Sequence, residues 1–555
     1  MTDNLSEFRY IFSLISKVGL IDMELNSQNR PFSIKLWPPS QNTRQTLVEK
    51  MTNNLTTKSI FTQKYETLHP KQAEENAKRI EDKAFATANL HYEKEPDGDG
   101  GSAVQLYAKE CSKLLLELLK MGPSKNSVKE AVISDAAAVP RESVFDISKG
   151  QRAFIEAEEA QELLSPLKEP GNSFTKICFS NRSFGLGAAE VAKPIFISLK
   201  DQLKEVDLSD FIAGRPEAEA LDVMRIFSAT LEGSVLKYLN LSDNALGEKG
   251  VRAFGTLLKS QSCLEELYLM NDGISEEAAQ AVSELIPSTE KLKVLHFHNN
   301  MTGDEGARAI AEVVKRSSCL EDFRCSSTRI GDEGGVALSD ALGDCTHLRK
   351  LDLRDNMLGV EGGVSLSKAL AKNAELREIY LSFLNLEDEG AIAIANALKA
   401  SAPRLEVLEM SGNNITVDAA PAIANCLAAK QFLAKLNLSE NELKDEGAIQ
   451  ISKALEGLSQ LKEIDLSCNR ITRDGAQQLA LTVLQKVDFE RLDIDGNFIS
   501  DEGIKELMVI FEKSPDKLGP LDENDPDGKD GDEESDEEGG VEDALESKMK
   551  NLVVD

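Results

Sequence analysis

Few residues of this chain could carry out chemistry, and none of them forms a recognised catalytic motif. The sequence lacks the phosphate-binding pattern G-x-x-x-x-G-K-[ST], the zinc-protease pattern H-E-x-x-H and the nucleophile pattern G-x-S-x-G. His296 and His298 lie two residues apart on one expected strand, but no third metal ligand accompanies them. Carboxylate pairs such as Asp352 and Asp355 recur along this acidic chain and indicate a solvated surface rather than a glycosidase pair. The sequence therefore predicts no active site, no metal and no cofactor.

Arg215 is the residue best placed to act on the chemistry of a partner. It lies between Gly214 and Pro216, where five residues are inserted into an otherwise regular repeat array. A loop arginine is usually only a surface charge. An exposed arginine on a stiff loop can, however, stabilise a phosphoryl transition state in another protein. Asn271 lies on the next turn, where it either contacts a partner or supports a row of repeated asparagines.

Composition limits the class of partner. The chain has 555 residues, with 63 Lys and Arg against 95 Asp and Glu, and a net charge of −32. Such a polyanion is a poor candidate for binding nucleic acid and favours basic surfaces on proteins. The eight cysteines include no C-x-x-C pair, which favours reduced thiols. No apolar run is long enough for membrane insertion, and Asp3 and Glu7 stand where a secretion signal needs positive charge.

A repeated pattern positions these residues. The template L-x-x-L-x-L-x-x-N-x-L recurs, for example as LDLRDNML from Leu351 and LNLSENEL from Leu436. Its Asn position, here termed the Asn slot, falls at residues 244, 272, 300, 328, 356, 384, 413, 441, 469 and 497. The alternating leucines predict a short strand, and the Asn predicts a hydrogen-bonded turn after it. A small residue six positions after the Asn predicts a helix that packs closely on the strands. Two weaker units start at Phe174 and Leu203.

Stacked units of this kind predict an α/β leucine-rich-repeat solenoid, similar to ribonuclease inhibitor, with about 12 repeats of 28 residues. The strands would line its concave face, which becomes acidic toward the end of the array. Tyr268, His296 and Asp352 lie on this face. We expect them to contact a partner, although solubility alone would explain the same charges.

The rest of the chain is predicted to form separate parts. These are an N-terminal extension (1–30) expected to be disordered, a small all-α domain (31–93), a linker (94–101), a helical connecting region (102–170), the repeats (171–515) and an acidic tail (516–555) expected to be disordered. Two apolar stripes predict the helices of the all-α domain: Leu47, Val48, Met51 and Leu55, and then Ala73, Ala77, Ile80, Ala84 and Ala88.

These features resemble a known family. Residues 171–515, with LKEVDLSDF, the AGRPEAEAL loop, LNLSDNALGEKG and LEELYLMNDGIS, together with the acidic tail, resemble the Ran GTPase-activating proteins. The stretch IKLWPPSQNTRQTLVEKMTNNL, from Ile34, resembles a WPP domain, which is named for Trp37-Pro38-Pro39. The combination of the two is characteristic of the plant members of that family.

The resemblance implies an activator of GTP hydrolysis by the small GTPase Ran, acting in the cytoplasm and so giving nucleocytoplasmic transport its direction. It implies that Ran binds in its GTP form, with Arg215 and Asn271 as activating contacts and Asp243 and Asn244 on the adjoining turn. Arg215 would help to position the catalytic glutamine of Ran rather than enter the active site. The chain departs from fungal members at Glu217, where a basic residue often follows the arginine.

The resemblance also implies that Trp37, Pro38 and Pro39 belong to a targeting domain. It would bind coiled-coil anchor proteins at the outer face of the nuclear envelope, with the spindle or the cell plate as further locations during division. Trp37 can equally be a simple core residue. The alternative for the repeats is a protein-binding scaffold with no effect on GTP hydrolysis.

Overall fold

The structure is a computed structural model, and it describes part of the chain. The described residues are 70–94, 143–149 and 152–525, with single helical positions at 44, 48, 51, 52, 55, 106, 107, 110, 111, 113 and 114. The chain divides into two compact units, Met1–Ala137 and Ala138–Asp555. Trp37, Pro38 and Pro39 lie outside the described residues, as does the tail beyond Asp525. Among the helices described, none combines the length and the apolar character needed to cross a membrane.

The N-terminal unit is helical at its described positions. Helix α3 (Pro70–Lys94) buries the face that the sequence predicts, which consists of Ala73, Ala77, Ile80, Ala84 and Ala88. Val48, Met51 and Leu55 of the other predicted stripe are buried as well. The apolar periodicity of the sequence therefore identifies the core of this small domain correctly.

A polar cluster in the same unit shows that the domain extends past its predicted end at residue 93. Glu81 is buried and accepts hydrogen bonds from Arg44 Nε (2.6 Å), Arg44 Nη2 (2.8 Å) and Tyr107 Oη. Burial and the hydrogen bond to Glu81 raise the pKa of Tyr107, so its hydroxyl stays protonated and donates. Because a buried carboxylate needs such partners, Tyr107 and the equally buried Cys111 belong to this unit and not to a separate connecting region.

The second unit is a repeat array on a parallel sheet of thirteen strands, in the order β1-β3-β5 and then β6 to β15 in sequence. Its strands are β1 (Ser143–Asp146), β3 (Phe174–Cys178), β5 (Glu205–Asp207), β6 (Tyr238–Asn240), β7 (Glu266–Tyr268), β8 (Val294–His296), β9 (Asp322–Arg324), β10 (Lys350–Asp352), β11 (Glu378–Tyr380), β12 (Val407–Glu409), β13 (Lys435–Asn437), β14 (Glu463–Asp465) and β15 (Arg491–Asp493). Strand β2 (Ala153–Ile155) pairs in parallel with β4 (Arg182–Phe184) in a separate two-stranded sheet.

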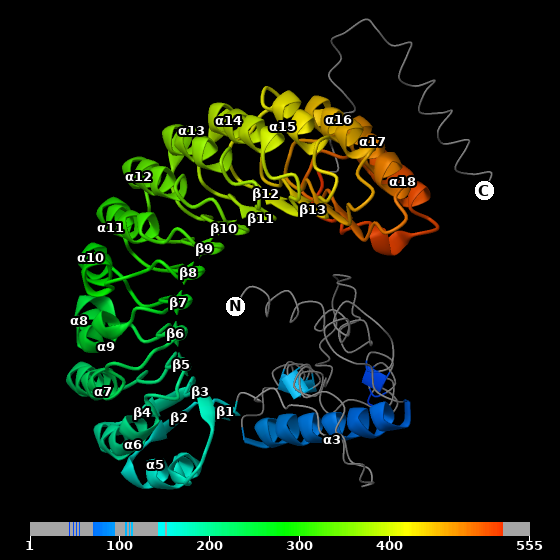
Figure 1. Cartoon of the computed structure of the whole chain (residues 1–555). Coiled ribbons are helices and arrows are strands. Elements are labelled where there is room, and N and C mark those ends of the chain that lie inside the picture. The colour runs from blue at the N-terminus through cyan, green and yellow to red at the C-terminus, as the bar shows by residue number, and fades with distance from the viewer. Residues whose placement is uncertain are drawn as a thin grey trace, which may run out of the picture. The chain divides into compact units, whose positions relative to one another are not determined.

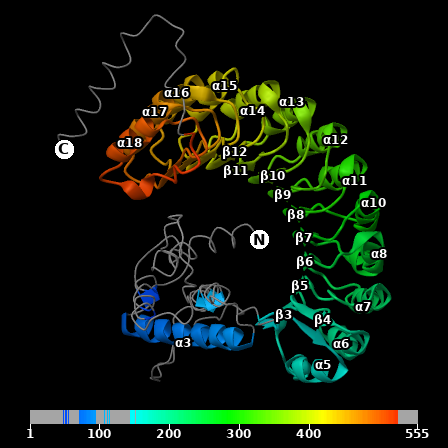
Figure 2. The ribbon, with the colours of Figure 1, turned by 180° about the vertical axis from the view of Figure 1, so that it is seen from behind.

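Helices cover the outer side of this curved array, while the strands line its inner side (Figure 1, Figure 2). The helices are α5 (Ala157–Leu163), α6 (Leu186–Leu199), α7 (Glu217–Thr230), α8 (Gly247–Ala253), α9 (Gly255–Ser260), α10 (Glu276–Leu285), α11 (Gly303–Lys315), α12 (Asp332–Leu342), α13 (Gly359–Leu370), α14 (Glu387–Ala400), α15 (Ala420–Leu427), α16 (Lys444–Leu455), α17 (Arg473–Leu484) and α18 (Asp501–Ile510), with short 3-10 turns η2 (Ser165–Lys168) and η3 (Pro515–Lys517). The predicted leucine-rich-repeat solenoid is confirmed.

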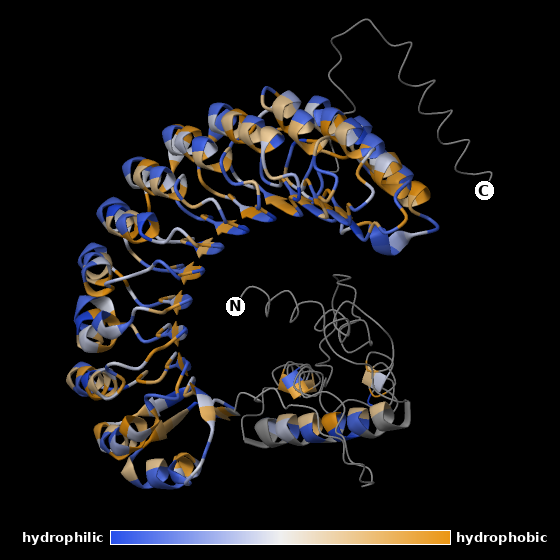
Figure 3. Ribbon diagram, in the orientation of Figure 1, coloured by the Kyte–Doolittle hydropathy of each residue, from blue (hydrophilic) through white to orange (hydrophobic). Residues whose placement is uncertain are grey.

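One continuous apolar core lies between the two layers. In the three-residue strands from β5 to β15 the central residue is buried, as are the leucines on either side of it; in β10, for example, Leu351 lies between Leu348 and Leu353. Figure 3 shows the apolar colour on the strands and on part of each helix. The small residue six positions after the Asn slot allows neighbouring helices to approach: a Cβ on Gly334 would lie 2.8 Å from Cα of Asp304 in the preceding unit. Side-chain size at this position therefore limits the spacing of the units.

The array is longer than the sequence predicts at both ends. Strands β1 and β2 lie within residues 102–170, which the sequence predicts to be helical. β1 pairs along the edge of β3, where it satisfies backbone groups that would otherwise be free. At the other end, the predicted tail contributes residues 516–525: Gly519 N donates to Leu492 O (2.7 Å), and Asn524 Oδ1 accepts from Asn497 N (3.0 Å). Asn524 is thus a further Asn slot that closes the array.

Candidate functional site

The Asn slots form a buried row of hydrogen bonds beneath the turns that follow the strands. In Asn244, Oδ1 accepts from Phe211 N (3.0 Å) and Nδ2 donates to Leu208 O (2.8 Å) and Leu241 O (2.7 Å). The same arrangement recurs at Asn356, Asn441 and Asn497. Asn244 is only 2% exposed. Its side chain is fully used inside the fold, so the structure corrects the prediction that Asn244 contacts a partner.

The residue before each Asn slot lies on the exposed rim, and its backbone is left-handed. Residues 181, 210, 243, 271, 299, 327, 355, 383, 412, 440, 468 and 496 all have positive φ, between 51° and 65°. Asn and Asp tolerate this conformation better than other side chains with a Cβ. Three successive members of this line are Asp243, Asn271 and Asn299, which we term the rim row.

Side-chain hydrogen bonds join the rim row. Asn271 Nδ2 donates to Asp243 Oδ1 (2.8 Å), and Asn299 Nδ2 donates to Asn271 Oδ1 (2.9 Å). All three residues are exposed. The structure therefore brings together two predicted residues, Asp243 and Asn271, and adds Asn299, which the 28-residue period could have identified. The row presents amide and carboxylate oxygens in a fixed line along the edge of the array.

Arg215 is not the exposed arginine that the sequence predicts. Its side chain is 8% exposed. Nη2 donates to Ser183 O (2.7 Å) and Ile155 O (3.2 Å), Nε donates to Ser183 Oγ (3.2 Å), and Nη1 donates to Glu156 Oε1 (2.5 Å). A second carboxylate, Glu219 Oε1, lies 3.6 Å from Nη1. These partners come from β2, β4, the start of α5 and α7, so the guanidinium joins four elements at the N-terminal end of the array.

The local chain explains why the arginine turns inward. Between β5 and α7, the inserted loop runs from Ser209 to Pro216, and Pro216 precedes the first turn of α7. Gly214 has a φ of +80°, and a Cβ there would lie 3.0 Å from the Phe154 ring. Only a residue without a side chain allows Phe154 to lie so close to this left-handed turn. The ring also packs against Arg215, with the guanidinium carbon 4.9 Å from the ring centroid.

The concave face holds the other predicted contacts, and most of them have partners within the fold. Tyr268 packs edge-to-face against His296 at 4.9 Å, and His296 Nε2 lies 3.1 Å from Asp322 Oδ1. Asp352 pairs with Arg354 Nη2 at 2.7 Å. Burial would raise the pKa of Asp322, but hydrogen bonds with His296 and Arg324 lower it to about 2. This face therefore presents charges held in fixed positions, which suits recognition better than proton transfer.

His298 differs from its neighbours on this face. Burial and the adjacent His296 lower the pKa of His298 to about 4, so its ring is neutral near neutral pH. Within the described part of the chain, no three side chains of His, Cys, Asp and Glu gather closely enough to hold a metal ion. His296 and His298 place aromatic and hydrogen-bonding groups on this face, with their ring centroids 6.3 Å apart.

Comparison with known proteins places these features in a family. Residues 33–129 match the WPP domain, and residues 234–255, 344–367, 429–452 and 458–480 match the leucine-rich repeat. The chain is 71% identical over 242 residues to RAN GTPase-activating protein 2 of Arabidopsis thaliana, which covers 44% of each chain. It is 62% identical over 240 residues to RAN GTPase-activating protein 1 of the same plant, which covers 43% of this chain and 44% of the relative. It is 33% identical over 130 residues to MFP1 attachment factor 1 of Solanum lycopersicum, which covers 23% of this chain and 80% of the relative.

The chain belongs to the WPP-domain proteins. It spans less than half the length of the two Arabidopsis RAN GTPase-activating proteins that it matches, 44% in each case. The predicted resemblance to plant Ran GTPase-activating proteins with a WPP domain and leucine-rich repeats is thus confirmed. The WPP match extends to residue 129, in agreement with the burial of Tyr107 and Cys111 in the N-terminal unit.

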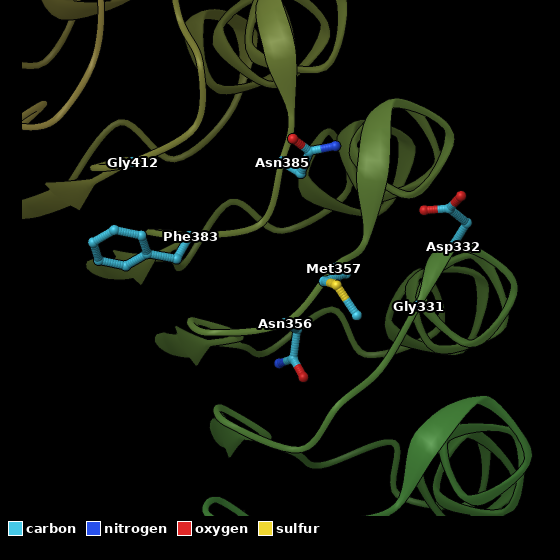
Figure 4. Close-up of a pocket in the computed structure, with 7 residues that line it drawn as sticks. All are labelled: Gly331, Asp332, Asn356, Met357, Phe383, Asn385 and Gly412. Carbon is cyan, nitrogen blue, oxygen red and sulfur yellow. The ribbon is translucent and has the colours of Figure 1, made fainter.

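Further along the same rim, the array has a hollow with apolar side chains. A cavity of about 580 Å³ is lined by Gly331, Asp332, Asn356, Met357, Phe383, Asn385 and Gly412 (Figure 4). Phe383 and Gly412 are left-handed rim positions in line with Asn271. Met357 is 65% exposed. The rim therefore changes from amide and carboxylate groups at Asp243, Asn271 and Asn299 to an apolar surface near the middle of the array.

Sequence reasoning missed the residues around Arg215. Glu156 and Phe154 lie in a segment that the sequence predicts to be helical, and Ser183 lies in a weak repeat. No local pattern links them to a loop that lies up to 60 residues away. Only the fold brings them together.

Proposed function

We propose that this protein activates GTP hydrolysis by Ran, to which it binds while Ran carries GTP. The observation that supports this function best is the 71% identity over 242 residues to RAN GTPase-activating protein 2 of Arabidopsis thaliana. The protein acts in trans and has no active site or cofactor of its own. Its place of action is the cytoplasm, where hydrolysis keeps Ran in its GDP form and gives nuclear transport its direction.

Positioning is the mechanism that fits the rim best. Asn271, fixed between Asp243 and Asn299, offers hydrogen-bonding groups that need no reorganisation when a partner arrives. Arg215 is held within the fold, so it shapes the neighbouring loop instead of entering the GTPase as a finger. Tyr268, His296 and Asp352 on the concave face extend the contact with Ran, and the net charge of −32 attracts a basic partner surface.

The WPP domain serves as an anchor in the same proposal. It binds coiled-coil proteins of the nuclear envelope through Trp37, Pro38 and Pro39 and keeps the activator at the outer face. The likeness to MFP1 attachment factor 1 over 80% of that relative supports an attachment role. During division, the same domain takes the activator to the spindle or the cell plate.

Single-turnover GTP hydrolysis by purified Ran, with and without the full chain, tests the activity. Arg215→Ala and Asn271→Ala should each slow the stimulated rate by about 10- to 150-fold, the equivalent of one hydrogen bond to a charged group at ~1.5–3 kcal/mol. An arginine finger would cost about 10³-fold or more. The matched controls are Arg225→Ala, an exposed arginine of α7, and Asn425→Ala, an exposed asparagine of α15, and both should keep full activity.

Three outcomes separate the possibilities. Stimulation that falls in both Arg215→Ala and Asn271→Ala and persists in both controls supports the proposal. Binding of Ran without any stimulation by the unaltered protein would instead indicate a leucine-rich-repeat scaffold. Full stimulation by folded Arg215→Ala and Asn271→Ala variants contradicts the assignment of these residues.

A further inference from the structure

The short segment Arg152–Glu156, which contains β2, contacts the inserted loop at Asp210, Gly214 and Arg215; we term this segment the strap. Arg152 Nη2 and Nε form a two-pronged contact with the carboxylate of Asp210, a left-handed rim residue, at distances of 2.6 to 3.1 Å. Phe154 packs on Gly214 and Arg215, and Glu156 pairs with Arg215 at 2.5 Å. Three side chains of the strap thus hold three successive parts of the loop.

Nearly every donor of Arg215 is used in these contacts. A guanidinium has five N–H groups. Ser183 Oγ, Ser183 O, Ile155 O and Glu156 Oε1 take four of them, and the remaining N–H of Nη1 lies on the side of Glu219, 3.6 Å away. To donate a hydrogen bond to a partner protein, Arg215 would therefore have to break one of these existing bonds. Withdrawing Nη2 would leave the buried carbonyl oxygen of Ser183 or Ile155 without its partner, which is costly.

Glu156 is the charged part of this arrangement that solvent can reach. Its side chain is 56% exposed, whereas that of Arg215 is 8% exposed. Glu156 also begins α5, and its backbone N–H donates to Glu159 Oε2 at 3.1 Å, so its own position is fixed by the helix start. A helix terminus therefore holds the carboxylate in place, and the carboxylate holds the arginine.

We infer that Glu156 is a positioning residue for Arg215, and that the strap fixes the loop which the activator presents to its GTPase. The inference rests on the proposed activation of Ran and adds a role for a segment that precedes the repeats. Phe154, 55% exposed on the outside of the same contact, shields the guanidinium from water and strengthens its pairing with Glu156. The loop is then preorganised before Ran binds, and Arg215 acts by stabilising the conformation of the loop from within the fold.

The test uses the full chain and single-turnover hydrolysis by Ran over a range of activator concentrations. Glu156→Gln should lower the maximal rate on the order of three- to ten-fold, since the lost ion pair is half exposed and worth less than a buried one. The half-saturating concentration should change less than about two-fold, because the loop loses order rather than contact area. Glu156→Asp should restore most of the rate. Glu158→Gln removes the same charge two residues away, on the exposed first turn of α5, and should change nothing.

Amide exchange of residues 212–215 gives a second readout that does not depend on Ran. Exchange there should be faster in Glu156→Gln and in Phe154→Leu, and unchanged in Glu158→Gln, with thermal melts to confirm folding. Unchanged exchange in a folded Glu156→Gln variant overturns the inference. A higher maximal rate in that variant would also overturn it, because the strap would then restrain an arginine that must leave its site. If the unaltered protein fails to stimulate Ran, the proposed function fails, while the exchange result still decides the role of Glu156.

Discussion

Asp272 occupies an Asn slot, and replacing it by Asn should stabilise the array. In this row the slot Nδ2 donates to two carbonyls, three and thirty-one residues earlier, as Asn356 does to Leu353 O and Cys325 O. At Asp272 the same register places Leu241 O and Leu269 O, but the side-chain atom that faces them is an oxygen instead of the amide nitrogen of an Asn. Asp272 Oδ2 is buried and has no hydrogen-bond partner, while Oδ1 accepts from Asn244 N at 2.8 Å. Burial, and to a lesser extent the nearby Asp243, raise the pKa of Asp272 well above its usual range.

The size and the sign of the effect follow from this geometry. Two new hydrogen bonds in place of an unsatisfied buried oxygen are worth about 1–3 kcal/mol. A second contribution depends on pH. Because the folded pKa is raised, the neutral acid stabilises the fold fully below the unfolded pKa of about 3.9, and this stabilisation is lost as pH rises through the folded pKa. The advantage of Asp272→Asn should therefore grow with pH, by up to about 1.4 kcal/mol per unit between the unfolded and the folded pKa.

Thermal melts at pH 5 and pH 7 measure this difference, with amide exchange at Asn244 as a local readout since repeat arrays can unfold in parts. The reciprocal control is Asn300→Asp, which introduces the same acid into the next slot and should destabilise the fold more at pH 7 than at pH 5. A melting difference that is equal at both pH values, or a destabilised Asp272→Asn variant, would show that Asp272 is ionised in the fold and would refute the reasoning.

Other parts of the chain give three further expectations. Lys430 is buried, and its Nζ donates to Ser401 O (2.6 Å) and Ala402 O (3.2 Å) beyond the end of α14. Lys430→Met should therefore lower the free energy of unfolding, measured by thermal melts, by about 2–3 kcal/mol. Lys399→Met, on the exposed last turn of the same helix, should lower it little. Deleting residues 526–555 should slow association with Ran most at low salt and little near ~0.15 M, where the Debye length is ~8 Å; an equal rate at every salt concentration would make the tail irrelevant to steering. Replacing Trp37 and Pro38 by Ala should release the protein from the nuclear envelope in imaging while activation in solution persists, and loss of both together would contradict separable units.

The repeated features of this fold could be predicted from the sequence because each appears many times. The leucines, the Asn slots and the small residue of the helix all recur at one period, so a single misfit such as Leu384 does not hide the pattern. Leu384 shows how the fold tolerates the misfit: Asn356 N donates to Phe383 O instead of a slot side chain. Periodicity therefore identifies the scaffold and the line of the rim, including Asn271.

Features that occur once could not be predicted in the same way. The exposure of Arg215 depends on Glu156 and Ser183, which lie 59 and 32 residues away in sequence. The closing residue Asn524 lies in an acidic stretch whose composition is typical of a disordered tail. In both cases a tertiary contact outweighs the local signal. Local composition cannot reveal such a contact when its partner belongs to another element.

The arrangement of slot and rim also explains how one scaffold can carry a specific site. A left-handed backbone is unfavourable for Phe383, Glu440 and Cys468, yet all three adopt it. The buried slots fix the turn by binding its N–H and C=O groups, so the rim conformation does not depend on which side chain is exposed there. The rim can therefore change its chemistry from asparagine to phenylalanine at constant shape. Asn244 and Asn300 fix the shape of the rim from within, whereas Asn271, one residue before a slot, is exposed on the rim where the proposed contact with Ran would form.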